Sequence, residues 1–210
     1  ETVSMVVLGD SNVVGVPPNE GSFRTELFAA LAADGYTVAP LGQYSDSGGA
    51  HEGINGQAYS YFLGTQLARI LTDYAPHLPR VIVSWLGTND MVQGNPVVYP
   101  TQGVINAGLF VEQVYAADPL TWMVLCTAPP FAAGGYPAEF PGYILQFNID
   151  LKALVATKRA LGRRVLLCDA FAVLDPGNGS DADLVDGVHL SVAGRTKAAD
   201  VIHDTVAALF

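Results

Sequence analysis

The sequence predicts an α/β fold: a three-layer α/β/α sandwich around a five-stranded parallel sheet, with residues 1–210 forming one domain. Three observations support this. Short apolar runs alternate with helical patterns along the whole chain. The run at 80–86 is apolar nearly throughout, as expected for a strand that is covered on both faces. No internal repeat or linker divides the chain. Strands that alternate with helices pair in parallel through crossover connections.

The individual elements follow from local periodicity. Helices are expected where apolar residues recur every three or four positions, and strands where short β-branched runs are bounded by turn residues. Gly35 and Gly162 are expected to end two helices. Residues 42–57 and 127–141 are rich in turn-forming residues and are expected to form loops. The expected strands span 4–8, 36–41, 80–86, 122–126 and 164–168, and the expected helices span 22–33, 59–74, 104–117, 143–161 and 192–209.

The charge balance argues against two classes of partner. The chain has 20 acidic and 10 basic residues and a net charge of −10. Such a surface repels nucleic-acid phosphates and anionic lipids, so we expect neither a nucleic acid nor a membrane partner, and the surface suits a neutral substrate. The most apolar stretch, 120–133, is interrupted by Pro129-Pro130 and is too short to span a bilayer.

The cysteines and the start of the chain bear on its environment. Cys126 and Cys168 fall within expected strands and are interpreted as buried free thiols, although neighbouring strands would also permit a disulfide. The chain begins at Glu1 without a signal-peptide pattern, as a processed or trimmed protein would. Together with the glycosylation sequon Asn178-Gly179-Ser180, this leads us to expect a secreted protein.

Ser11 is the candidate nucleophile. The apolar run Val6-Val7-Leu8 leads directly into Gly9-Asp10-Ser11, so the serine hydroxyl is expected at the carboxyl edge of the sheet. Open α/β folds place their ligand crevice at this edge. The alternative is that Asp10 and Ser11 only cap a helix or close a turn.

His189 is the candidate general base. Asp186 precedes it by three residues, a spacing that can bring the carboxylate to Nδ1 and leave Nε2 free to accept the serine proton. The alternative is that Asp186 caps the last helix and His189 lies in its first turn. His51 is a rival base, but its glycine-rich loop favours a stabilising hydrogen bond instead.

Three groups could donate hydrogen bonds to an oxyanion: the Ser11 N–H, the Gly56 N–H and the Asn89 side-chain amide. Asn89 follows the strand at 80–86, and Gly87 permits the tight turn between them. Gly56 has no side chain to block an approaching substrate. The alternatives are an ordinary helix cap at Asn89 and an ordinary turn glycine at Gly56.

Four blocks occur in order along the chain: Gly9-Asp10-Ser11, the glycine at 56, Gly87-Thr88-Asn89-Asp90 and Asp186-Gly187-Val188-His189. Together they resemble the SGNH (GDSL-type) hydrolases. The resemblance implies a flavodoxin-like SGNH hydrolase fold. It also implies a catalytic triad of Ser11, Asp186 and His189, and an oxyanion hole formed by Ser11, Gly56 and Asn89.

A closer resemblance is to the acetylxylan esterases of carbohydrate esterase family 3. It is carried by Phe23-Arg24-Thr25-Glu26-Leu27, His51-Glu52-Gly53 and the segment 183–189. The chain departs from that pattern at Leu190-Ser191, where Pro-Asn is usual, and at Gln57, where an aromatic residue is usual.

These resemblances imply a serine esterase that hydrolyses short-chain (acetyl) esters through an acyl-enzyme, with no cofactor and no metal. Its substrate would be a small acyl ester or an acetylated polysaccharide such as xylan. The alternatives are a general lipase, arylesterase or thioesterase of the same superfamily, and an inactive carbohydrate-binding module with this fold.

Two further groups of residues complete the expectations. The rings at 131–143 could stack on a sugar or line an acyl pocket, or they could simply cover the sheet edge. The oxygen-rich loop at 175–183 could bind calcium, but its spacing matches no EF-hand and favours a solvated acidic loop. The expected substrate-binding residues are Asp10, Phe131, Tyr136, Phe140 and Tyr143, and the loop oxygens belong to Asp175, Asn178, Ser180, Asp181 and Asp183.

Overall fold

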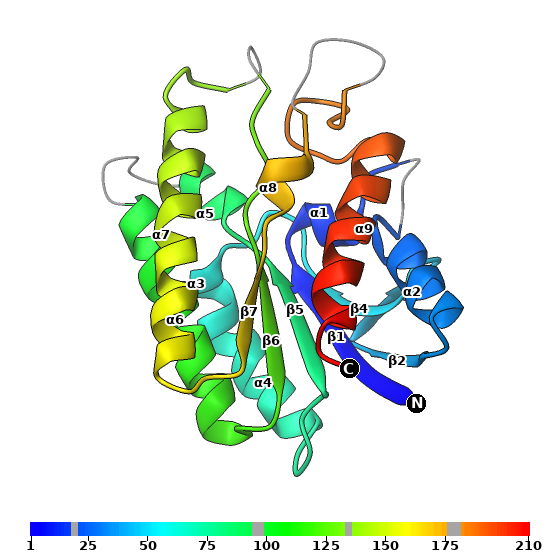
Figure 1. Ribbon diagram of the computed structural model, residues 1–210. Coiled ribbons are helices and arrows are strands. Elements are labelled where there is room, and N and C mark those ends of the chain that lie inside the picture. Colours follow the sequence, from blue (N-terminus) through cyan, green and yellow to red (C-terminus); the bar gives the residue numbers. More distant parts are fainter. Residues whose placement is uncertain (18–20, 94–98, 133–135, 176–181) are drawn as a thin grey trace.

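The computed structural model describes residues 1–17, 21–93, 99–132, 136–175 and 182–210. Across these ranges a sheet of seven strands forms the central layer, and helices cover both of its faces (Figure 1). The strands are β1 (Thr2–Gly9), β2 (Thr37–Leu41), β3 (Tyr44–Asp46), β4 (Gly49–Gly53), β5 (Val81–Trp85), β6 (Trp122–Cys126) and β7 (Val165–Cys168).

β1 is central to the sheet. The strand order is β3-β4-β1-β5-β6-β7, and β2 pairs with β1 as well. β2 pairs with Thr2–Val6 of β1, and β4 pairs with Leu8 and Gly9 further along the same strand. All pairings are parallel except that of β3 with β4. This arrangement brings the end of β4 beside the end of β1.

Two apolar cores lie on opposite faces of the sheet, because successive strand residues point to opposite sides. Val3, Met5 and Val7 of β1 belong to one core, and Val6 and Leu8 belong to the other. The first core packs against α1 (Ser11–Val14), α2 (Arg24–Ala33), α8 (Ala170–Val173) and α9 (Val192–Ala207). The second packs against α3 (Tyr59–Tyr61), the π-helical turn η1 (Phe62–Gln66), α4 (Leu67–Asp73), α5 (Thr88–Val92), α6 (Tyr99–Ala117) and α7 (Phe140–Ala160).

The predicted α/β class is confirmed, with corrections to the elements: the short helices α1, α5 and α8 lie outside every expected helix. The expected loop at 42–57 contains β3 and β4, so the sheet is larger than five strands and has one antiparallel pair. The Gly, Ser and Asp residues of this segment have low strand propensity, but pairing of β4 with β1 overrides it. No helix in the described part of the chain is long and apolar enough to cross a membrane.

Cys126 and Cys168 are both buried free thiols, as expected, and they are direct partners across the β6–β7 pair.

A fully buried arginine connects the segment after β1 to the β3–β4 hairpin. The Arg24 guanidinium donates to the carbonyl of Val13 (3.0 Å), to the carbonyl of Gly49 (2.9 Å) and to the carboxylate of Asp46 (2.6 Å). A buried charge is tolerated when its donors are satisfied in this way. Arg24 therefore holds α1 against β4.

We expect Arg24→Met to lower the free energy of unfolding by about 3–5 kcal/mol, because it removes the guanidinium donor from Asp46 Oδ2 and from two backbone carbonyls. Urea unfolding would measure the loss. The exposed Arg159→Met is the control and should change stability by less than about 1 kcal/mol. An Arg24 variant as stable as the control would contradict this role.

Candidate active site

The segments that follow three strands bring the candidate residues to one edge of the sheet. α1 follows β1 and α5 follows β5 (Figure 1). Ser11 is the first residue of α1, Asn89 lies in α5, and Gly56 lies in the loop after β4. These strands are parallel, so their carboxyl ends meet at the same edge. Ser11 and Asn89, which are 78 positions apart in the sequence, thereby line the same cleft.

Ser11, His189 and Asp186 form a continuous chain of hydrogen bonds. The Ser11 Oγ lies 2.8 Å from His189 Nε2, and His189 Nδ1 lies 2.6 Å from Asp186 Oδ2. The other carboxylate oxygen of Asp186 accepts the backbone N–H groups of Val188 (3.1 Å) and His189 (2.9 Å). An acceptor at Nδ1 favours the tautomer that carries its proton there, which leaves Nε2 able to take the hydroxyl proton.

The environment of Asp186 favours its charged form. Partial burial opposes ionisation, but the hydrogen bonds from the His189 ring and from the backbone N–H groups outweigh it and lower the pKa of Asp186 below its usual value. The segment that carries both residues is closed by a bridge between Leu184 and Leu190 and by a hydrogen bond from the Val185 N–H to the His189 carbonyl (2.8 Å).

The three predicted oxyanion donors also line this cleft. In the described part of the chain, neither the Ser11 N–H nor the Gly56 N–H has a hydrogen-bond acceptor, so both are free to bind a ligand oxygen. Gly56 has φ +73°, a left-handed backbone conformation that favours glycine. The space around it would admit a side chain, so the backbone conformation is the reason for glycine here. Asn89 donates one Nδ2–H to Asp10 Oδ2 (3.2 Å).

Asp10 does not line the cleft, contrary to the expected substrate contact. Only 1% of the residue is exposed, and its Oδ1 accepts the Asn12 N–H (2.9 Å) as the N-cap of α1. Burial raises the pKa of Asp10 to about 6. Its neighbour Asp90 accepts the Tyr59 N–H (3.1 Å), and burial likewise raises the pKa of Asp90 to about 6.

The cleft has a volume of about 370 Å³ and combines the predicted site residues with others to which the sequence analysis gave no role. The additional residues lie within five positions of a motif residue, so proximity in the sequence is the signal that could have found them. They are Val16, Asn55, Thr88, Val92 and Val188. The Gln93 amide, just beyond α5, donates to the Gly56 carbonyl and connects the segments that carry Asn89 and Gly56.

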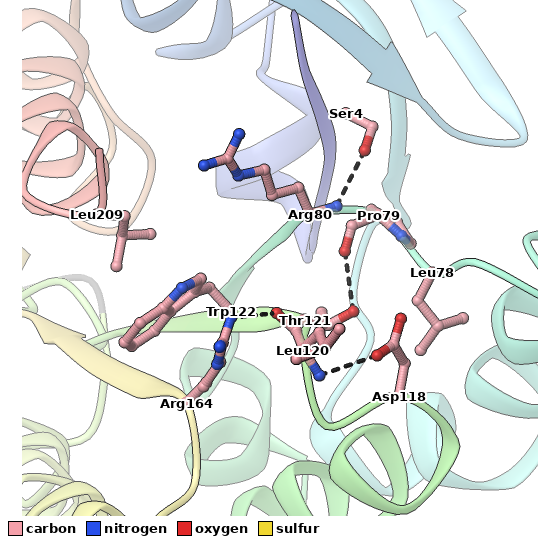
Figure 2. Close-up of a pocket in the computed structure, with 10 residues that line it drawn as sticks. All are labelled: Ser4, Leu78, Pro79, Arg80, Asp118, Leu120, Thr121, Trp122, Arg164 and Leu209. Atoms are coloured by element: carbon pink, nitrogen blue, oxygen red, sulfur yellow. Dashed lines mark hydrogen bonds between the residues drawn. The ribbon is translucent and has the colours of Figure 1, made fainter. Parts of the chain in front are cut away.

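A larger hollow of about 440 Å³ lies at the opposite edge of the sheet, between Arg80, Trp122 and Arg164 (Figure 2). Among the described residues that line it there is no histidine, and the hydroxyl of the one serine, Ser4, accepts the Arg80 N–H (3.0 Å). It lacks the groups needed for nucleophilic catalysis, so the cleft at Ser11 is the candidate active site.

Of the four predicted aromatic residues, only Tyr136 lines the cleft. Phe131 is 4% exposed and belongs to the core, and its ring centroid lies 4.8 Å from that of Tyr136. Phe140 and Tyr143 are half-buried and pack against the same core. For Phe131, Phe140 and Tyr143 the structure therefore favours the alternative in which rings cover the sheet edge.

His51 lies away from the cleft, in the buried network of Arg24. Its Nδ1 accepts the Gly53 N–H (2.9 Å), and its Nε2 faces Asp46 (3.3 Å). Burial and the nearby Arg24 lower the pKa of His51 to about 4, so the ring is neutral at pH 7. This matches the expectation of a stabilising hydrogen bond and not a second base.

The proposed calcium loop lies largely outside the described residues, as does the sequon. Asn178, Ser180 and Asp181 are not described; Asp183 is fully buried and pairs with Lys197 (2.7 Å). Within the described ranges there is no cluster of three or more His, Cys, Asp or Glu residues suited to a metal ion.

Comparison with known proteins places this chain in a family. A sequence model of the GDSL-like lipase/acylhydrolase family matches residues 7–197, a span that includes all five predicted motif residues. A search among curated proteins finds no significant match.

Solved structures share the fold at low sequence identity. The family 3 carbohydrate esterase of Clostridium thermocellum is 20% identical, with a TM-score of 0.78 over 100% of this chain and 97% of that one. A family 3 carbohydrate esterase of Talaromyces cellulolyticus is 18% identical, with a TM-score of 0.79 over 99% and 97%. A lipase/acylhydrolase of Enterococcus faecalis is 18% identical, with a TM-score of 0.75 over 99% and 96%.

The buried carboxyl of Asp10 should make stability depend on pH. Its pKa is raised from 3.8 to about 6 in the fold, so protonation stabilises the fold fully below about pH 4, and this contribution is lost as the pH rises through 6. Asp10→Asn lacks this titration. Relative to the native chain, its free energy of unfolding should therefore rise by about 3 kcal/mol between pH 4 and pH 8.

Urea unfolding of both proteins at pH 4, 6 and 8 would test this, with the exposed Asp200→Asn as a control for the loss of one charge. A difference between Asp10→Asn and the native chain that does not vary with pH would contradict the prediction.

Proposed function

Since this chain belongs to the GDSL-like lipase/acylhydrolase family and is therefore an ester hydrolase, we propose that Ser11 is its nucleophile and xylan or a related acetylated polysaccharide its substrate. The observation that carries the proposal is the hydrogen-bond chain from Ser11 through His189 to Asp186. A hydroxyl, a base and an orienting carboxylate in this order form the arrangement that activates a serine for attack on an acyl group.

The proposed reaction proceeds in two halves. His189 Nε2 takes the Ser11 proton as Oγ attacks the ester carbonyl, and the resulting oxyanion is bound by the N–H groups of Ser11 and Gly56 and the amide of Asn89. The tetrahedral intermediate collapses to an acyl-enzyme, and His189 protonates the departing alcohol. Water, deprotonated by His189, then attacks the acyl-enzyme and releases the carboxylic acid together with free Ser11.

The lining of the cleft supports a short acyl group. Val16, Val92 and Val188 provide apolar walls in the same cleft as Ser11, and the whole cleft measures only about 370 Å³. Tyr136, supported by the ring of Phe131, presents an aromatic surface at the same cleft, on which a sugar ring could stack. The net charge of −10 favours a neutral alcohol moiety over a polyanion.

Ser11→Ala should keep the fold and lower kcat on 4-nitrophenyl acetate by at least about a thousandfold, because it removes the attacking atom. The exposed Ser60→Ala is the matched control. Labelling with a fluorophosphonate, read by intact mass, should modify the native chain and the control but not Ser11→Ala. A Ser11→Ala enzyme with more than a tenth of the native rate would exclude Ser11, and an unlabelled, inactive native chain would favour a non-catalytic binding module.

A panel of 4-nitrophenyl esters should give the highest kcat/KM for acetate and a steep decline towards octanoate, since a longer chain cannot be enclosed by the valine walls. A preference for octanoate would favour the general lipase alternative.

Tyr136→Ala should raise KM on acetylated xylan by about three- to tenfold, the value of one lost stacking contact, and should change KM on 4-nitrophenyl acetate much less. Tyr61→Ala, an exposed tyrosine on α3, is the control. An equal change in KM on both substrates would show that Tyr136 does not contact the alcohol part of the ester.

A further inference from the structure

Asp10 is a buried carboxylate that touches two parts of the site at once. Its Oδ1 accepts the backbone N–H of Asn12 in α1, the short helix that begins with Ser11. Its Oδ2 accepts the Nδ2–H of Asn89 in α5 (3.2 Å). With only 1% of the residue exposed, solvent hardly competes for these bonds.

The bond to Asn89 determines which end of its amide faces the cleft. A side-chain amide has a donor end and an acceptor end, and it can present either after a half-turn. An ionised carboxylate only accepts hydrogen bonds, so Asp10 binds the NH₂ end and would repel the carbonyl end. One hydrogen of Nδ2 is then used by Asp10, and the other remains available on a side chain that lines the cleft.

We propose that Asp10 is a positioning residue that orients the Asn89 amide as a donor to the oxyanion and aligns this donor with Ser11. The inference rests on the proposed function, in which Asn89 belongs to the oxyanion hole. Through its two carboxylate oxygens, Asp10 fixes the position of the Asn89 amide relative to the start of α1, which carries Ser11. An oxyanion donor contributes only when its position is set before the charge develops.

A purely structural role as a helix cap would make a different prediction. Asparagine and serine cap helices about as well as aspartate, so Asp10→Asn and Asp10→Ser should both retain the bond to the Asn12 N–H. Neither retains the second acceptor. In Asp10→Asn the new NH₂ group faces that of Asn89, and in Asp10→Ser the hydroxyl is too short to reach it. Under the cap role alone both variants would keep the native kcat.

The test is a double-mutant cycle on 4-nitrophenyl acetate at pH 8, with kcat and KM measured separately and folding checked by circular dichroism. Asn89→Ala should lower kcat by about a hundred- to a thousandfold, as loss of an oxyanion donor does. Asp10→Asn and Asp10→Ser should each lower kcat by about ten- to a hundredfold, with KM changed less than about threefold. In the Asn89→Ala background, Asp10→Asn should change kcat by less than about twofold.

A native kcat in both Asp10 variants would overturn the inference. So would a double variant in which Asp10→Asn lowers kcat by the same factor as it does in the native chain. If Asn89→Ala itself kept the native kcat, the oxyanion role of Asn89 would fall together with the inference. Fluorophosphonate labelling of Ser11 would then show whether the nucleophile assignment survives. If only the inference about Asp10 is wrong, Asn89→Ala will have a strongly reduced kcat while both Asp10 variants keep the native kcat.

Discussion

The site depends on one buried guanidinium. Removing a charge from water costs several kcal/mol, and only a full set of acceptors offsets that cost. Arg24 finds these acceptors on three separate segments: the Val13 carbonyl in α1, the Gly49 carbonyl at the start of β4 and the carboxylate of Asp46. All three are satisfied only when α1 lies against the hairpin. The turn that holds Ser11, the proposed nucleophile, and the strand that leads to Gly56 are therefore assembled before a substrate arrives.

Three carboxylates near the reacting atoms differ because their surroundings differ. Asp10 and Asp90 are buried, and burial raises the pKa of each to about 6. Asp186 is more than half exposed at its side chain, and its hydrogen bonds lower its pKa. The carboxylate beside the imidazole is thus the one that keeps its charge most readily. This division keeps negative charge beside the His189 ring, where it would stabilise the protonated imidazole.

The strands at the centre of the sheet and the residues at their ends were predictable, because both depend on local pattern. Apolar runs indicated β1, β5, β6 and β7, and parallel topology then required Ser11 and Asn89 to share an edge. β3 and β4 were not predictable from their own residues, since β4 is held by pairing with β1 and β3 by pairing with β4. The position of Asp10 escaped prediction for a similar reason: its partner Asn89 lies 79 residues away, and nothing in the local motif indicates burial.

The bridge between Leu184 and Leu190 encloses both His189 and Asp186 in one short loop. The imidazole and its carboxylate are consequently carried by the same loop, so a displacement of the whole loop moves both of them relative to Ser11. Under the proposed mechanism, local unfolding of this loop would inactivate a molecule completely instead of only lowering its rate. In a preparation in which this loop has unfolded in part of the molecules, the total activity should fall with the number of intact molecules, while each intact molecule keeps its full rate.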